Sequence, residues 1–311
     1  MLTTARRPIA PLLAFACLLA WMAPLIALAP SASAGETVDL RPRFQVGQPV
    51  RFELTLRTRT HAPRELQELG MAMPSTELRM TLTMTPTEAG EPGDGAAVRL
   101  TIDELQYQTD TPEPVSFDSR QRRGSPPNDP GANPLHAAFA GFMQNPMTVR
   151  IDGRGNVTGV DAAAPSGLGA GGDPAGAIGG AVRQLFGPII TSAPQSGVAR
   201  VGERWTTRTS MPGLAVGAGE LTTTHHLVSA QRDRANIDVR GEFQTGAGGI
   251  GAAESRFNGE MVWDRRAQMI ERYEGALDLT VRLPAGLDAA ASENAGSIRL
   301  EQSMHIRRLG R

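Results

Sequence analysis

The chain has 311 residues, with 31 arginines, no lysine and 32 acidic residues, so its formal net charge is −1. This near-neutral balance argues against a dedicated nucleic-acid binder, which would need a basic surface. The single cysteine, Cys17, lies in the apolar N-terminal segment. Disulfides, cysteine-ligated zinc, iron–sulfur clusters and thiol catalysis are therefore excluded from the remainder of the chain.

Residues 1–34 have the pattern of a cleavable secretory signal. Arg6 and Arg7 form a basic start, an uncharged apolar segment runs from residue 9 to 29, and small residues at 32–34 provide a cleavage site. An uncleaved anchor is the alternative, because an apolar segment of this length could span a bilayer. The prolines in and after the apolar segment, and the small residues at 32–34, favour cleavage. The arginine pair leaves twin-arginine export open, although the strong apolar segment favours Sec export.

The remainder of the chain shows mainly the period of two that is typical of β-strands. Apolar and polar residues alternate in segments around residues 52–57, 78–85, 98–103, 147–151, 237–240, 277–283 and 298–306. Alternate side chains of a strand point to opposite faces, so this pattern predicts antiparallel sheets with one dry and one wet face. Asp152 to Asn156 predicts a tight turn between two of these strands.

Two short helices are expected in the middle of the chain. Leu135, Ala138, Phe139, Phe142 and Met143 have helical spacing after a proline. The second helix is expected over residues 175–186, where apolar residues again recur at helical spacing. Four segments rich in glycine, proline, alanine or serine, near residues 119–133, 161–173, 244–253 and 284–296, predict loops.

The mature chain from residue 35 is expected to form a single β-rich domain, with two similar β halves as an alternative. The halves would span residues 35–160 and 190–311, joined by the helical segment. The second interpretation depends on a short sequence repeat, in which Val46-Gly47 precedes one predicted long strand and Val201-Gly202 precedes another. The fold class is therefore mainly β, in the form of a curved half-barrel or of two related halves.

These features together resemble a known family. The order is an export signal, a Val-Gly strand start, the helix around Phe139, the turn after Ile151, and Val201-Gly202-Glu203-Arg204-Trp205. The chain resembles an uncharacterised family of exported bacterial proteins that carry a domain of unknown function. That resemblance implies export and a β-rich fold, and it implies no catalytic residues. More distantly, the chain is similar to half-barrel lipoprotein carriers, in which a curved sheet wraps helices around an apolar cavity.

Several common catalytic motifs are absent from the chain or lack the structural context that they need. The glycine pattern of dinucleotide-binding loops occurs at residues 167–172 and 246–251, but neither copy lies in a clear βαβ unit. A phosphate-binding loop of the Walker type needs a lysine. No G-x-S-x-G nucleophile motif occurs. His225 and His226 are adjacent, so in a strand they face opposite ways and cannot easily share one metal ion.

Methionines on alternating apolar faces suggest a place for an apolar ligand, because flexible thioethers suit an adaptable pocket. The alternative is that these methionines belong to an ordinary hydrophobic core. The candidate ligand face comprises Leu78, Met80, Leu82, Met84, Phe139, Phe142 and Met143. Arg120, Arg122 and Arg123 could bind anions, or could belong to a solvated loop.

We therefore expect a non-catalytic protein of the bacterial cell envelope, periplasmic or extracellular, that binds an apolar small molecule or an envelope protein. A structural or assembly role is one alternative. The other is a hydrolase of a cell-wall or extracellular polymer that uses dispersed carboxylates or histidine. No cofactor, metal, nucleic-acid partner or transmembrane segment is expected once the signal has been removed.

Overall fold

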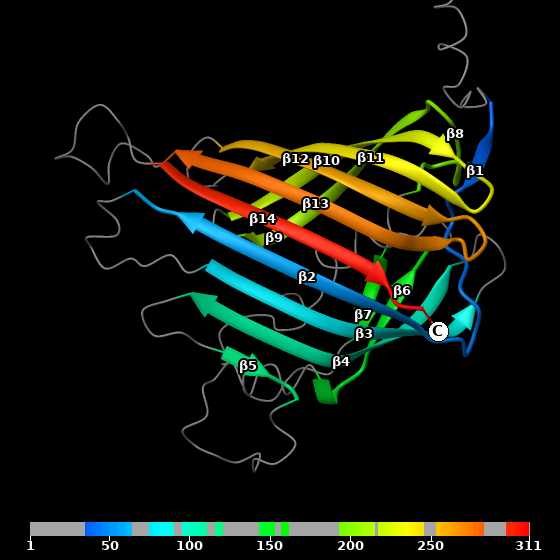
Figure 1. Ribbon diagram of the computed structural model, residues 1–311, viewed down its shortest axis with the longest axis horizontal. Coiled ribbons are helices and arrows are strands. Elements are labelled where there is room, and N and C mark those ends of the chain that lie inside the picture. The colour runs from blue at the N-terminus through cyan, green and yellow to red at the C-terminus, as the bar shows by residue number, and fades with distance from the viewer. Residues whose placement is uncertain are drawn as a thin grey trace, which may run out of the picture. The chain divides into compact units, whose positions relative to one another are not determined.

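A computed structural model of the chain describes residues 35–63, 75–89, 95–110, 116–120, 143–152, 157–161, 193–214, 217–245, 253–282 and 297–310. These residues belong to one structural unit, Gly35–Arg311. The elements they form are β-strands (Figure 1). In chain order the strands are β1 (Thr37–Asp39), β2 (Val50–His61), β3 (Ser75–Ala89), β4 (Ala96–Asp110), β5 (Ser116–Asp118), β6 (Met147–Ile151), β7 (Val157–Asp161), β8 (Val198–Arg200), β9 (Arg204–Leu214), β10 (Gly217–Ala230), β11 (Arg234–Thr245), β12 (Ala253–Asp264), β13 (Met269–Arg282) and β14 (Ser297–Arg308).

Twelve of the strands form one antiparallel sheet that does not close on itself. Its order is β7-β6-β4-β3-β2-β14-β13-β12-β11-β10-β9, and β5 pairs with β4 outside this path. The first long strand, β2, lies beside the last, β14, so the two ends of the domain meet in the middle of the sheet (Figure 1). Strands β1 and β8 form a separate two-stranded ribbon. The mainly antiparallel β architecture predicted from the alternating segments is thereby confirmed.

One face of the large sheet is dry, as the period of two predicts. In the centre, Phe52 pairs with Leu82, and Leu54 lies between Met80 and Ile306. All five side chains are buried. Because the alternation continues through the neighbouring strands, the buried side chains join into a single apolar core.

The opposite face carries charged side chains in cross-strand pairs. Arg57 contacts Glu77 at 3.1 Å, and Arg307 contacts Glu53 at 2.7 Å. These side chains are about a third to two thirds exposed. Exposed pairs of this kind contribute between about 0 and 1 kcal/mol each, so the dry face, not the charged one, supplies most of the stability.

The two Val-Gly sequences form the same kind of turn. The Gln48 N–H donates to the Gln45 carbonyl at 3.1 Å, and the Glu203 N–H donates to the Arg200 carbonyl at 2.8 Å. The glycine at the third position of each turn has a positive φ, 75° at Gly47 and 89° in the other turn. A glycine adopts this conformation without steric cost. The two turns share this geometry, and the duplication of two β halves stays a prediction.

The two predicted helices are not confirmed. The first falls on residues 135–143, of which only Met143 is described, and the second falls on residues 175–186, which lie outside the described residues. Within the described part of the chain only Met143 and Gln144 have helical backbone geometry, and no complete helix is present there. The expectation of a mainly β fold with two short helices therefore reduces to a mainly β fold for the residues whose structure is described.

Candidate functional site

The strongest candidate site lies where four central strands of the sheet begin or end. Strands β2 and β13 begin here, β14 ends here, and β3 approaches its own end at Pro86. The segment that joins β1 to β2 passes across this end of the sheet. Since these elements come from both ends of the chain, the site forms only when the domain is complete.

Backbone hydrogen bonds hold the crossing segment in place. The Arg43 N–H donates to the Gln268 carbonyl in the turn between β12 and β13, at 3.1 Å. The indole Nε1 of Trp263 donates to the carbonyl of Asp39 at 3.1 Å, which ties the start of the segment to β12. After β14, the Leu309 N–H donates to the Arg51 carbonyl at 2.9 Å. These bonds fix the walls of the site.

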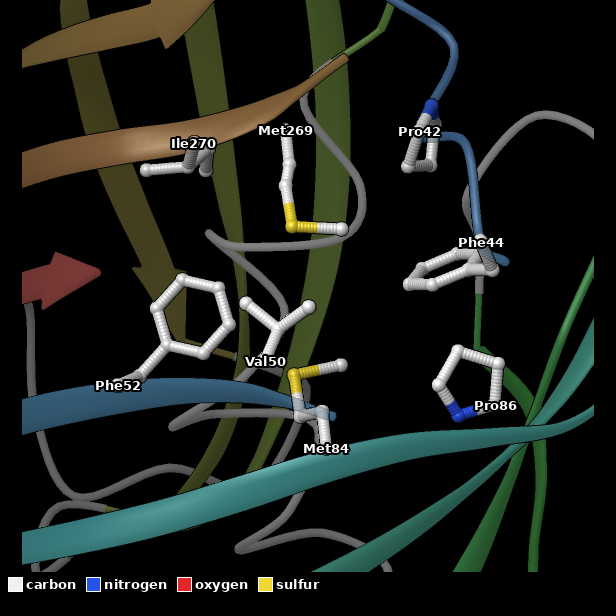
Figure 2. A pocket seen from close by; sticks show the side chains of 8 residues that line it. All are labelled: Pro42, Phe44, Val50, Phe52, Met84, Pro86, Met269 and Ile270. Atoms are coloured by element: carbon white, nitrogen blue, oxygen red, sulfur yellow. The ribbon is translucent and has the colours of Figure 1, made fainter. Parts of the chain in front are cut away.

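An apolar pocket lies beneath the crossing segment (Figure 2). The lining residues that the structure describes are all apolar: Pro42, Phe44, Val50, Phe52, Met84, Pro86, Met269 and Ile270. Figure 2 shows the rings of Pro42, Phe44 and Pro86 on one side and the side chains of Phe52, Val50 and Ile270 on the other. Met84 and Met269 extend their thioethers between the two groups.

The free volume of this pocket is about 10 Å³, the space of one water-sized group. Thioether side chains adapt their shape at little cost. The two methionines are therefore the residues that would let the pocket admit something larger than a methyl group.

A larger cleft adjoins the apolar pocket. Its volume is about 580 Å³, within the range of small-molecule sites. The cleft shares Val50, Pro86 and Met269 with the apolar pocket. Its lining comprises Arg43, Gln45, Gln48, Pro49, Val50, Arg51, Pro86, Arg266, Ala267, Met269, Arg308, Leu309 and Gly310.

Arg308 is the most buried arginine of the cleft, with 19% of its side chain exposed. It pairs with Asp264, which also accepts the backbone N–H groups of Arg266 and Ala267, each at 2.9 Å. Burial alone would raise the pKa of the Asp264 carboxyl, but these hydrogen bonds and the Arg308 charge together hold that pKa below its usual value. The carboxylate therefore stays ionised and orients both the turn and the guanidinium.

The predicted ligand face is only partly at this site. Met84 lines the apolar pocket. Leu82 and Met80 are buried in the core, and Leu78 is half-buried at its border. Met143 is partly buried and packs against the same core. Phe139 and Phe142 lie outside the described residues, so the face as a whole stays a prediction.

The residues that complete the site were missed from the sequence. Phe44 and the four arginines stand in irregular segments or at strand ends, where no periodicity marks them. The only local sign is a proline, Pro42, two residues before an aromatic residue in a segment that connects two strands. Their meeting depends on pairing between strands that are far apart in the sequence.

His225 and His226 face opposite sides of β10, as predicted. His225 is 5% exposed on the dry face, whereas its neighbour is only partly buried. The ring Nε2 of His225 lies 3.0 Å from the hydroxyl of Thr207 and 3.1 Å from that of Thr223. The ring of Trp205 stacks on the imidazole with a centroid distance of 5.3 Å. Burial lowers the pKa of His225 to about 4, so the ring is neutral near pH 7.

The remaining candidate groups stay apart. Arg120 pairs with Glu104, while Arg122 and Arg123 lie outside the described residues. Both glycine-rich motifs, at 167–172 and 246–251, also fall outside them. Within the described ranges, His, Cys, Asp and Glu side chains form no group of three or more that could hold a metal ion. The same ranges contain no helix of the length and apolarity needed to cross a bilayer.

Comparison with known proteins adds no relative. No family model and no curated protein matches the chain. Among solved structures, the crystal structure of MucB in complex with MucA(peri) is 7% identical, and the match covers 84% of this chain and 88% of that chain. Its TM-score of 0.10 is too low to support an argument about fold or function.

Proposed function

We propose that the chain is a non-catalytic protein of the bacterial cell envelope that binds an apolar or amphipathic ligand in the cleft at the start of β2. One observation carries the proposal: a cleft of about 580 Å³ adjoins a pocket whose described lining residues are all apolar. Binding sites for small molecules are concave and mostly apolar, with a few polar groups that fix orientation. A curved half-barrel, which the open antiparallel sheet would permit, is part of the same proposal.

Export is the second part of the proposal and is supported by the pattern of residues 1–34. Intact mass measurement of the protein from the periplasmic fraction tests it. We expect a chain that begins at Gly35. A full-length chain retained in the membrane fraction would contradict export as a free domain.

The binding proposal can be tested with a fluorescent amphipathic probe, 1-anilinonaphthalene-8-sulfonate, and the purified folded protein. We expect saturable binding that Phe44→Asp abolishes, because this change places a carboxylate in the apolar pocket. The matched control is Val46→Asp, two residues away, at a side chain that is 56% exposed. Binding that is absent, or equally weakened by both changes, would contradict the proposed site.

A further inference from the structure

Charge in the cleft is one-sided. Among the residues that the structure describes, its ionisable lining residues are the four arginines Arg43, Arg51, Arg266 and Arg308, with no aspartate or glutamate. Arginine binds carboxylates and phosphates through two parallel N–H donors, which makes it suited to anion recognition.

Three of these arginines already have carboxylate partners that lie outside the lining. Arg266 contacts Asp233 at 2.6 Å, and Arg51 contacts Asp103 at 3.5 Å. Arg308 pairs with Asp264, as described above. Arg43 is exposed and has no carboxylate partner among the described residues. Its guanidinium is therefore the donor available to an incoming anion.

The position of the cleft argues against a peptide that adds a strand. Such peptides pair with an exposed sheet edge. The cleft lies at the ends of β3, β2, β14 and β13, which occupy the middle of the sheet, whereas β7 and β9 form its two ends. A ligand that enters here approaches strand ends, whose backbone groups are not arranged as a free edge.

The apolar pocket narrows the choice further. Its free volume of about 10 Å³ admits a group as thin as a methyl end, and widening it depends on Met84 and Met269. An unbranched alkyl chain meets this restriction better than a ring or a branched side chain. The ligand should then place an anionic head among the arginines and a narrow apolar chain between the two thioethers.

We infer that the cleft binds a single-chain amphiphile with an anionic head group, a carboxylate or a phosphate. This inference rests on the proposed binding function and specifies its ligand class. Arg43 holds the head, and the pocket beneath Phe44 takes the chain end.

Isothermal titration with four twelve-carbon amphiphiles, each below its micellar concentration, tests the inference. Sodium dodecanoate and dodecyl phosphate carry the two candidate anions, dodecyltrimethylammonium carries a cation, and dodecanol is neutral. We expect the anions to bind most tightly, and the tighter of the two identifies the head group. Arg43→Gln should weaken anion binding by about tenfold, the effect of one charge-assisted hydrogen bond. The control Arg240→Gln, at an exposed position on β11 between Thr224 and Asn258, should change nothing.

The possible failures are distinguishable. If the cation or the alcohol binds as tightly as the anions, or if Arg43→Gln has no effect, the anionic class is wrong and the binding function stands. If no amphiphile binds and the fluorescent probe does not bind either, both the amphiphile inference and the proposed binding function are wrong. If a short glutamate-rich peptide with one leucine displaces dodecanoate at lower concentration, the occupant is an acidic peptide and the amphiphile inference is overturned.

Discussion

Acidification from pH 7.5 to pH 5 should destabilise the fold through His225. The imidazole is 5% exposed, is covered by Trp205, and has a pKa lowered by burial from its usual 6.5 to about 4. Unfolding returns the ring to water, where it takes up a proton near pH 6.5. Between these two pKa values the unfolded chain binds more protons than the folded one. Stability therefore falls as the pH drops below about 6.5, and the loss is complete near pH 4.

The magnitude follows from the two pKa values. A difference of about 2.5 units corresponds to about 3.4 kcal/mol at low pH, because one unit is worth 1.36 kcal/mol. At pH 5 the folded ring is about 90% neutral, and the loss relative to pH 7.5 is about 2 kcal/mol. That loss is a large share of the stability of an ordinary domain.

Urea unfolding at pH 7.5 and pH 5 measures this loss directly. The variant His225→Gln should lose about 2 kcal/mol less than the wild type over this interval, whatever its own stability at pH 7.5. The control is Thr224→Gln, at an exposed position on the opposite face of β10, which carries no titratable group and should keep the wild-type pH dependence. If the glutamine variant does not fold, the ring of His225 can be titrated by NMR in the wild type, with an expected midpoint near pH 4. A midpoint near 6.5, or equal pH dependence in all three proteins, would refute the reasoning.

Four substitutions test the fold itself by urea unfolding. Leu54→Ala should lower the free energy of unfolding by about 3 kcal/mol, because the side chain is fully buried in the centre of the sheet. Glu53→Ala on the charged face should lower it by no more than about 1 kcal/mol. Equal losses would contradict the assignment of a dry and a wet face. Gly47→Ala should cost about 1 kcal/mol, because φ is 75° but the space around an added Cβ is open. Gly275→Ala should cost about 1–3 kcal/mol, because its Cβ would lie 2.9 Å from two buried aromatic side chains. A Gly275→Ala protein as stable as the wild type would show that this close packing of the rings is wrong.

Alternation of apolar and polar residues was sufficient to predict the central strands β2 and β3. In β2 and β3, Phe52, Leu54, Met80 and Leu82 stand at every second position, and the structure buries all of them. The period depends only on the geometry of an extended chain, so it is visible without knowledge of the neighbouring strands.

Strand β10 shows why other strands were missed. Its dry face includes Thr223 and His225, both buried and hydrogen-bonded to each other. Because these residues are polar, the face does not alternate in hydropathy although it alternates in burial. Such a face becomes recognisable only when the partners that satisfy its polar groups are known.

The candidate site could not be predicted for a different reason. Met84 was expected to face a ligand, and it does line the pocket. However, Phe44 precedes Met269 and Arg308 by more than two hundred residues, and the three reach the same place through the pairing of β2 with β14 and of β14 with β13. Pairing between strands that are distant in the sequence is set by the whole fold, and no short-range sequence pattern indicates it.

Methyl NMR of the protein labelled at the methionine methyl groups tests the binding account most directly. On titration with dodecanoate, the methyl signals of Met84 and Met269 should shift together and saturate, since both line the pocket. The signal of Met261, fully buried in β12 and absent from the pocket lining, should stay unchanged. Shifts centred on Met261, or no shift at either pocket methionine, would contradict the assignment of the ligand to this cleft.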